Sequence, residues 1–350
     1  MTGKLTILSV ASSFVPLTRD ACGGSEQIAF RLDSALVKAG HRSIMVACEA
    51  SRVSGTLVPL KPITAERKDI SSEVWSKQRK TIFDAIERYS PDMVHMHTVD
   101  FFRLMPPSDV RTLVTLHMPG SWYPEDYVRP RPNVWMNCVS WSQHQTFDPA
   151  LGLLDPVRNG VPAKELRRRH ARRNFLLNLG RICPEKGTHR AIDACRLAGA
   201  PLVVAGDVFP FAAYVEYMDK MVKPRLGDGA RYAGTFGFDR KSRFLSAAKG
   251  VLIPVMEPET SCLVAMESIS CGTPVIAFPK GAIPETVIDG LTGFLVNDEY
   301  EMAHAIGELS GLRADDCFQY ADEHLSEETM FQRYLSLYES IVTGAGRFAS

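Results

Sequence analysis

Predicted strands and helices alternate along the whole chain, and this alternation leaves few folds open to it. Short apolar runs rich in β-branched residues predict strands in the first half, at residues 5–10, 42–48, 92–97, 112–117 and 134–140. Similar runs predict a second set of strands at residues 175–179, 201–205, 230–233, 250–255, 274–278 and 293–296. The helical spacing of apolar residues predicts helices at residues 25–39, 74–89, 188–198, 242–248, 263–271 and 300–309. Strands that alternate with helices are typical of a parallel sheet covered on both faces, so we predict an α/β protein with two doubly wound domains.

The boundary between these domains is expected where proline, glycine and asparagine cluster, at residues 154–162. We therefore predict one domain over residues 1–157 and another over residues 158–326. The remaining segment, 327–350, begins with an apolar stripe at helical spacing and has no strand after it. We expect it to form a helix that packs back on the first domain.

Composition narrows the class of protein. The 350 residues include 40 lysines and arginines and 40 aspartates and glutamates, so the chain lacks the general positive field that would hold nucleic acid. Eight scattered cysteines form no CxxC pair, a pattern typical of reduced thiols. No apolar run is long enough to cross a membrane, and residues 1–4 lead directly into the first predicted strand without room for a signal peptide. We expect a cytoplasmic protein without an integral membrane segment.

Two glutamates lie eight positions apart near the predicted helix at residues 263–271. Glu259 falls in the loop after a predicted strand, and Glu267 lies in the helix itself. Thr260 or Ser261 is expected to cap this helix, whose free N–H groups would then face the carboxyl edge of the sheet. Helical side chains lean toward the N-terminus, so the Glu267 carboxylate is expected at the same place. The alternative is that both glutamates face solvent and the helix is purely structural.

Two cations lie in another loop, between the predicted strand at residues 175–179 and the helix at residues 188–198. Arg181 has the planar geometry that suits bidentate contact with a phosphate, and Lys186 supplies a compact positive charge. Together they indicate a site for phosphate groups. The alternative is a surface ion pair.

The flanking residues of both loops resemble family 4 of the retaining glycosyltransferases, which have the GT-B fold. That family carries a Glu-x7-Glu motif followed by Cys-Gly-x-Pro-Val, and here Glu259 and Glu267 precede residues 271–275, Cys-Gly-Thr-Pro-Val. The cationic loop, residues 180–187, resembles the family's Gly-Arg-x-x-x-Glu-Lys-Gly pattern. One departure is local: the family often has Pro-Phe-Gly-Leu after the first glutamate, and this chain has Thr-Ser-Cys-Leu at residues 260–263. This departure concerns the identity of the donor sugar.

The resemblance implies a retaining transferase of GT-B architecture, with two Rossmann-like domains facing a cleft. The expected donor is a UDP, GDP or ADP sugar, and the expected acceptor is a sugar, a lipid-linked group or a small molecule. Glu267 would hold the ribose, Glu259 would face the donor sugar, and the two cations would stabilise the leaving diphosphate. The expected catalytic residues are His117, Arg181, Lys186 and Glu259. The expected donor-binding residues are Gly23, Gly24, Gly180, Ser261, Cys262, Leu263, Val264 and Glu267.

In the first half, Gly23 and Gly24 open a predicted helix, and by the resemblance this turn faces the cleft. His117 ends a predicted strand, and the family commonly has a histidine near the transferring sugar at this place. His97, Trp122 and Tyr123 are weaker candidates for the acceptor pocket, because core packing explains such residues almost equally well. His95 and His97 lie on one face of a strand, which also permits metal binding, but no third ligand is visible.

No Asp-x-Asp motif occurs, so we expect no metal and no cofactor. Three other functions were weighed. A sugar-nucleotide 2-epimerase shares the architecture, but the context of the two glutamates speaks against it. An inactive nucleotide-sugar-binding protein would not require both cations and both glutamates. A nicotinamide-dependent dehydrogenase would require a glycine fingerprint after the first strand, which is missing. The base of the donor stays open.

Overall fold

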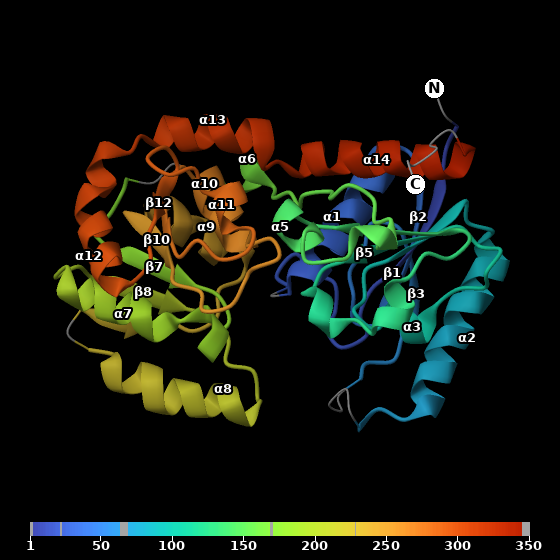
Figure 1. The fold of residues 1–350 in the computed structure, drawn as a ribbon, viewed down its shortest axis with the longest axis horizontal. Coiled ribbons are helices and arrows are strands. Elements are labelled where there is room, and N and C mark those ends of the chain that lie inside the picture. The colour runs from blue at the N-terminus through green and yellow to red at the C-terminus, as the bar shows by residue number, and fades with distance from the viewer. Residues whose placement is uncertain (1–2, 22, 64–68, 169–170, 228, 345–350) are drawn as a thin grey trace. The chain divides into compact units, whose positions relative to one another are not determined.

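The computed structural model describes residues 3–21, 23–63, 69–168, 171–227 and 229–344. The chain divides into two compact units (Figure 1). The first unit comprises Met1–Arg158 together with Met330–Ser350, and the second comprises Asn159–Thr329. Among the described helices, none combines the length and the apolar composition that crossing a membrane requires.

The first unit is built on a sheet of six strands in the order β3-β2-β1-β4-β5-β6. Its strands are β1 (Thr6–Val10), β2 (Arg42–Cys48), β3 (Thr56–Leu60), β4 (Met93–Met96), β5 (Thr112–Leu116) and β6 (Val134–Cys138). Every neighbouring pair runs parallel. The strand order reverses between β1 and β4, and the crevice outside the carboxyl ends of such strands is where open α/β sheets bind ligands.

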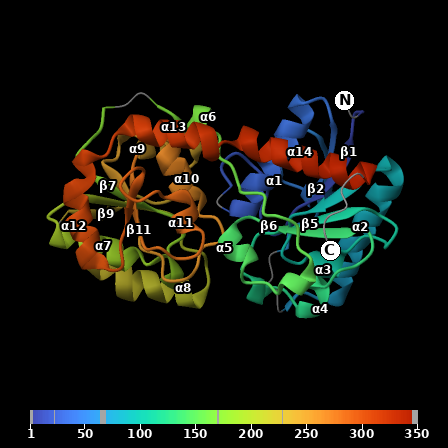
Figure 2. The same ribbon diagram turned by 45° about the horizontal axis from the view of Figure 1, so that its top comes forward.

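Helices cover both faces of this first sheet, whose strands other than the edge strand β3 are largely apolar and buried. They are α1 (Gly24–Lys38), α2 (Ser72–Tyr89), α3 (Phe101–Leu104), α4 (Glu125–Val128) and α5 (Trp141–His144). The long α14 (Glu327–Thr343) belongs to this unit from residue 330 onward (Figure 2). Its side chains Tyr334 and Tyr338 are fully buried. The remaining residues of the predicted C-terminal segment, 345–350, lie outside the described residues.

The second unit repeats the design with a sheet in the order β12-β11-β10-β7-β8-β9. Its strands are β7 (Leu176–Leu179), β8 (Leu202–Ala205), β9 (Ala230–Tyr232), β10 (Gly250–Ile253), β11 (Val275–Ala277) and β12 (Gly293–Leu295). These strands also pair in parallel throughout. The order reverses between β7 and β10, so their carboxyl ends form the ligand-binding edge of this sheet.

The second sheet separates the core of its unit into two clusters, one on each face, and helices pack against both. The helices are α6 (Ala163–Leu166), α7 (Thr188–Leu197), α8 (Ala212–Tyr217), α9 (Phe238–Ala247), α10 (Leu263–Ser270), α11 (Ile283–Thr286), α12 (Glu299–Glu308) and α13 (Ala314–His324). The predicted fold class, an α/β protein with two doubly wound sheets, is therefore confirmed.

The sequence patterns missed one strand, β3, and the helices α3, α4, α5, α6, α8, α11 and α13. The edge strand β3 contains Pro59, which lacks an N–H group and therefore argues against a strand in a sequence pattern. The helix α13 buries only Cys317 and Ala321, whose small side chains make a weak apolar stripe among charged residues. In both cases tertiary packing determined the structure of a segment with little local signal.

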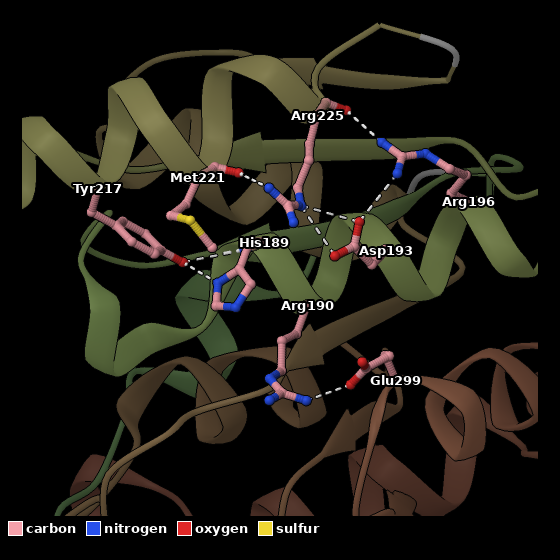
Figure 3. Close-up of polar contacts among 8 residues, drawn as sticks. All are labelled: His189, Arg190, Asp193, Arg196, Tyr217, Met221, Arg225 and Glu299. Carbon is pink, nitrogen blue, oxygen red and sulfur yellow. Dashed lines mark hydrogen bonds and ion pairs between the residues drawn. The ribbon is translucent and has the colours of Figure 1, made fainter.

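Polar contacts fix α7, the helix that follows the cationic loop (Figure 3). Tyr217 accepts a hydrogen bond from the backbone N–H of His189 and lies 2.8 Å from its ring Nδ1. Further along the helix, Asp193 accepts from Arg225 at 3.1 Å, and Arg190 donates to Glu299 at 2.5 Å. Tyr217 and Glu299 thus both hold the first turn of α7. The cationic loop before this helix therefore ends at a fixed position.

All seven described cysteines are free and buried, and Cys22 lies outside the described residues. In the basic run at residues 167–173, Arg167 pairs with Asp322 and Arg172 donates to the Ala248 carbonyl. Residues 169 and 170 of this run lie outside the described residues.

Candidate functional site

Two loops meet where the strand order of the second sheet reverses. One follows β7 and contains the short 3-10 helix η4 (Pro184–Lys186), and the other follows β10. The Met256 N–H donates to the Glu185 carbonyl at 2.8 Å and joins them. Gly187 lies at φ +65°, and a side chain there would collide with the Pro254 carbonyl. Only glycine allows this close approach of the two loops.

The contact between the loops brings two predicted catalytic residues together. The Lys186 ammonium forms an ion pair with Glu259 Oε1, and their side chains are only 24% and 17% exposed. Burial disfavours the ammonium, but the Glu259 carboxylate more than offsets this effect and raises the pKa of Lys186 above its usual value. Lys186 is therefore a permanent cation at the carboxyl edge of the sheet.

Arg181 lies in the same loop but has different neighbours. Its Nη1 is 3.4 Å from the hydroxyl of Tyr214, and that hydroxyl donates to Glu185 at 2.7 Å. The guanidinium is 3.9 Å from the Glu185 carboxylate and 36% exposed, so it is available to a ligand. Gly180, at φ +154°, directly follows the strand before this loop. Its carbonyl lies so close to Gly206 that Gly206 could not carry a side chain. The alternative considered for this loop, a surface ion pair, is thus partly correct for Arg181, which lies close to Glu185.

The helix α10 starts in a different way from the prediction. Neither Thr260 nor Ser261 caps it; its first flanking residue is Cys262, which has a left-handed conformation at φ +58° and no side-chain capping bond. The Ser261 hydroxyl instead accepts a hydrogen bond from the Asn159 amide at 2.9 Å. Burial raises the pKa of Cys262 to about 12, so its thiol stays neutral.

The amino end of α10 remains available to a ligand. Among the described residues, nothing accepts a hydrogen bond from the first-turn N–H groups of Leu263 and Val264. Such groups and the helix dipole attract negative charge. This end of the helix follows directly on the loop that contains Glu259.

Glu267 lies inside the protein rather than on the surface, which excludes the alternative that it faces solvent. The residue is 1% exposed. Its Oε1 lies 2.5 Å from the ammonium of Lys241, which belongs to α9 and was not identified from the sequence. The site of the second unit therefore holds two lysine–glutamate pairs.

The Gly23-Gly24 turn of the first unit opens α1 after β1, beside the point where that sheet reverses its order. A side chain at Gly23 would collide with the Glu26 carboxylate. Glu26 is 9% exposed and accepts a hydrogen bond from the Ser25 hydroxyl at 2.9 Å. The glycines thus leave room for a carboxylate at the start of the helix, a residue that the sequence did not single out.

Three buried histidines lie at the carboxyl ends of β4 and β5. His97 Nδ1 and His117 Nε2 are 3.1 Å apart. Burial lowers the pKa of His117 to about 4, and burial together with neighbouring histidines lowers the pKa of His95 and His97 well below the usual value. All three rings are therefore neutral near pH 7. Among the described residues, no group of three or more His, Cys, Asp or Glu side chains is placed to hold a metal ion.

Hydrogen bonds define the tautomer of His95. The Thr115 hydroxyl donates to Asn137 at 2.8 Å, so its oxygen must accept from His95 Nε2, which is also 2.8 Å away. His95 Nδ1 then accepts from the hydroxyl of Tyr338 at 2.7 Å. The helix α14 in this way orients His95, whose ring centroid lies 3.9 Å from that of His97 with the two rings tilted.

The aromatic residues expected near the acceptor have different environments. Trp122 is 54% exposed, whereas Tyr123 is 5% exposed and its hydroxyl accepts a hydrogen bond from the Met118 N–H at 3.0 Å. Core packing, the alternative considered from the sequence, describes Tyr123. The Tyr123 side chain supports the loop after β5, whereas the Trp122 ring is exposed to solvent.

Comparison with known proteins finds a family that part of the chain resembles. The family model of glycosyl transferases group 1 matches residues 163–315. A lipopolysaccharide 1,2-N-acetylglucosaminetransferase of Salmonella typhimurium is 30% identical over 171 residues, which are 45% of this chain and 44% of that protein. A glycogen synthase of Mycobacterium tuberculosis is 31% identical over 159 residues, 43% of this chain and 37% of that protein. The matches thus span less than half the length of these curated relatives.

Solved structures resemble the chain over almost its full length. A glycosyltransferase of avilamycin A biosynthesis has a TM-score of 0.73 at 22% identity, covering 97% of this chain and 98% of that one. A sucrose-phosphate synthase from Thermosynechococcus elongatus has a TM-score of 0.81 at 19% identity, covering 97% and 100%. The Anabaena protein HepE, solved with UDP and glucose, has a TM-score of 0.74 at 17% identity, covering 96% and 100%. These likenesses establish the GT-B fold, and residues 163–315 match the family model of glycosyl transferases group 1.

Proposed function

We propose that the chain is a retaining, metal-independent glycosyltransferase that takes a sugar from a nucleoside diphosphate donor. The observation that carries this proposal is the meeting of Lys186, Glu259 and the amino end of α10 where the second sheet reverses its strand order. Few ligands need both fixed positive charge for phosphates and buried carboxylates for hydroxyl groups. A sugar nucleotide needs both.

The donor is proposed to bind the second unit through these groups. The diphosphate contacts Arg181, Lys186 and the N–H groups at the start of α10, while Glu267 accepts hydrogen bonds from the ribose. Glu259 faces the donor sugar. HepE was crystallised with UDP-glucose, so a UDP sugar is the first donor to test. The first unit is proposed to bind the acceptor, with His117 near the sugar and with His97 and Trp122 as lining residues.

The proposed reaction breaks the bond between the anomeric carbon and the diphosphate oxygen, which keeps the electron pair. The acceptor hydroxyl attacks from the same face, and its proton passes to the departing diphosphate. Negative charge grows on the diphosphate as the bond breaks, so the fixed charges of Arg181 and Lys186 stabilise the transition state more than the bound donor. These two cations supply the charge stabilisation that a metal ion would otherwise provide.

Seven buried, unpaired thiols support a reducing compartment, and we propose the cytoplasm as the place of action.

Four nucleoside diphosphates test the proposal directly. UDP, GDP, ADP and deoxy-TDP are compared by thermal shift, and one of them is expected to raise the unfolding temperature. The matching sugar nucleotide should then release free diphosphate, with and without EDTA, and the product anomer should be assigned by NMR. Loss of activity with EDTA and its return with Mn²⁺ would refute the metal-free mechanism, and an inverted product would refute retention. An epimerase would be revealed by sugar isomerisation without a transfer product.

A further inference from the structure

Lys241 is a largely buried cation of the second unit that has no role yet in the proposed reaction. It lies in α9, and its ammonium is 2.5 Å from Glu267 Oε1. The side chains are only 13% and 2% exposed, which makes this the more buried of the two lysine–glutamate pairs. A pair at this depth is not a surface contact formed by chance.

Burial makes this pair important for the state of Glu267. A carboxylate that is nearly inaccessible to water loses most of its hydration, and it stays ionised only where a cation or several hydrogen bonds compensate. Lys241 is the cation that compensates here. Removing one partner of such a pair leaves an uncompensated charge, which is costly and commonly resolved by protonation or movement of the remaining group.

The geometry of the pair divides the two oxygens of Glu267 between two tasks. Oε1 is engaged by Lys241, and none of the hydrogen bonds found among the described residues runs to Oε2. An ionised carboxylate with one oxygen fixed has its other oxygen oriented as an acceptor. A neutral carboxyl group at the same place would carry a proton and lose acceptor strength.

We propose that Lys241 is a positioning residue that holds Oε1 of Glu267 in place and leaves its Oε2 to accept hydrogen bonds from the ribose hydroxyls of the donor. This inference rests on the proposed function. Lys241 acts through Glu267, so its effect is confined to the part of the donor that Glu267 binds. The diphosphate, which lies with Lys186 and the start of α10, is outside its influence.

The test compares three ligands on wild-type protein and on Lys241→Met, which keeps the length of the side chain and removes its charge. The ligands are the nucleoside diphosphate that the wild type binds, its dideoxyribose analogue, which lacks both ribose hydroxyls, and inorganic pyrophosphate. Calorimetry should show about tenfold weaker binding of the nucleoside diphosphate by the variant, since a hydrogen bond to a charged group is lost. Binding of the dideoxy analogue and of pyrophosphate should stay near the wild-type level.

Matched variants separate positioning from loss of structure. Arg243→Met removes a neighbouring cation of the same helix, an exposed residue that donates a hydrogen bond to the Asp239 carbonyl, and should change none of the three affinities. Lys241→Arg retains the charge and should recover most of the lost affinity. If Lys241→Met does not fold, Lys241→Gln is measured with the same three ligands and should show the same pattern to a smaller extent.

Each result decides between distinct conclusions. Equal losses for all three ligands would show that Lys241 holds the phosphates or the fold, and would overturn the inference. So would an unchanged affinity of the folded variant for the nucleoside diphosphate. A wild-type protein that binds none of the four diphosphates would instead overturn the proposed function, and the inference with it.

Discussion

The carboxyl edges of the two sheets hold their buried polar residues in contrasting ways. At the edge of the second sheet, Lys186 pairs with Glu259, and Lys241 pairs with Glu267 behind it. At the edge of the first sheet, His97 and His117 contact each other as uncharged rings. The second edge compensates its charges by pairing, and at the first edge the two histidine rings carry no charge.

This difference follows from what each edge is proposed to bind. A diphosphate is an anion, and fixed cations at low exposure interact with it more strongly than they would in water. An acceptor hydroxyl is neutral and needs hydrogen-bonding groups without strong fields. Neutral imidazoles offer a donor and an acceptor on one ring. The contrast therefore predicts that charge changes will affect the second unit far more than the first.

The largest effect is expected from Lys186→Met. This change removes the cation opposite the leaving diphosphate and also leaves Glu259 without its partner, so kcat should fall about 100-fold or more with a smaller change in KM. Steady-state kinetics with the identified donor measure both constants. Lys249→Met, which removes a lysine that donates only to the Ile306 carbonyl, serves as the control. A wild-type turnover rate in Lys186→Met would place the diphosphate elsewhere.

A second effect sharpens the contrast within the charged edge. Glu259→Gln keeps the shape of the side chain but removes the charge that faces a positive transition state, so kcat should fall about tenfold or more. Glu267→Gln should mainly raise KM, because the ribose hardly changes during the reaction. Calorimetry with free nucleoside diphosphate should show weaker binding for Glu267→Gln only. The reverse pattern would exchange the two assignments.

The smallest expected effect concerns the neutral edge and appears in stability rather than catalysis. His117 has a folded pKa of about 4, below its value of 6.5 in an unfolded chain. Between these values the unfolded chain binds the additional proton, so the free energy of unfolding should decrease as the pH falls from 6.5 toward 4. The slope is at most about 1.4 kcal/mol per pH unit for each such histidine.

Denaturant unfolding of wild-type protein and His117→Asn across this pH range measures the slope. In His117→Asn the slope should be smaller by the contribution of about one proton. Replacement of the exposed His304 by asparagine should leave the slope unchanged. Equal slopes in wild type and His117→Asn would mean that this edge does carry charge, and the contrast between the two units would fail.

Local patterns along the chain were sufficient for much of the fold. The alternation of apolar runs and helical stripes predicted eleven of the twelve strands, because burial on both faces makes each strand a continuous apolar run. The missed strand, β3, contains a proline at the sheet edge. The loops that hold Arg181, Lys186 and Glu259 were also recognised locally, since each directly follows a strand.

The partners of these residues depend on tertiary structure. Lys186 and Glu259 are 73 positions apart, Lys241 and Glu267 are 26 apart, and His95 lies 243 positions from Tyr338. The helix α10 was predicted from its sequence, but its expected cap was wrong because Ser261 bonds to Asn159 instead. The sequence by itself determined eleven of the strands, the helices with a clear apolar stripe and the strand-end loops, since these follow from periodicity within a few residues. Which side chains pair, and which stay neutral, was decided only by tertiary structure, because burial and Coulomb interaction act between residues that the chain brings together from far apart.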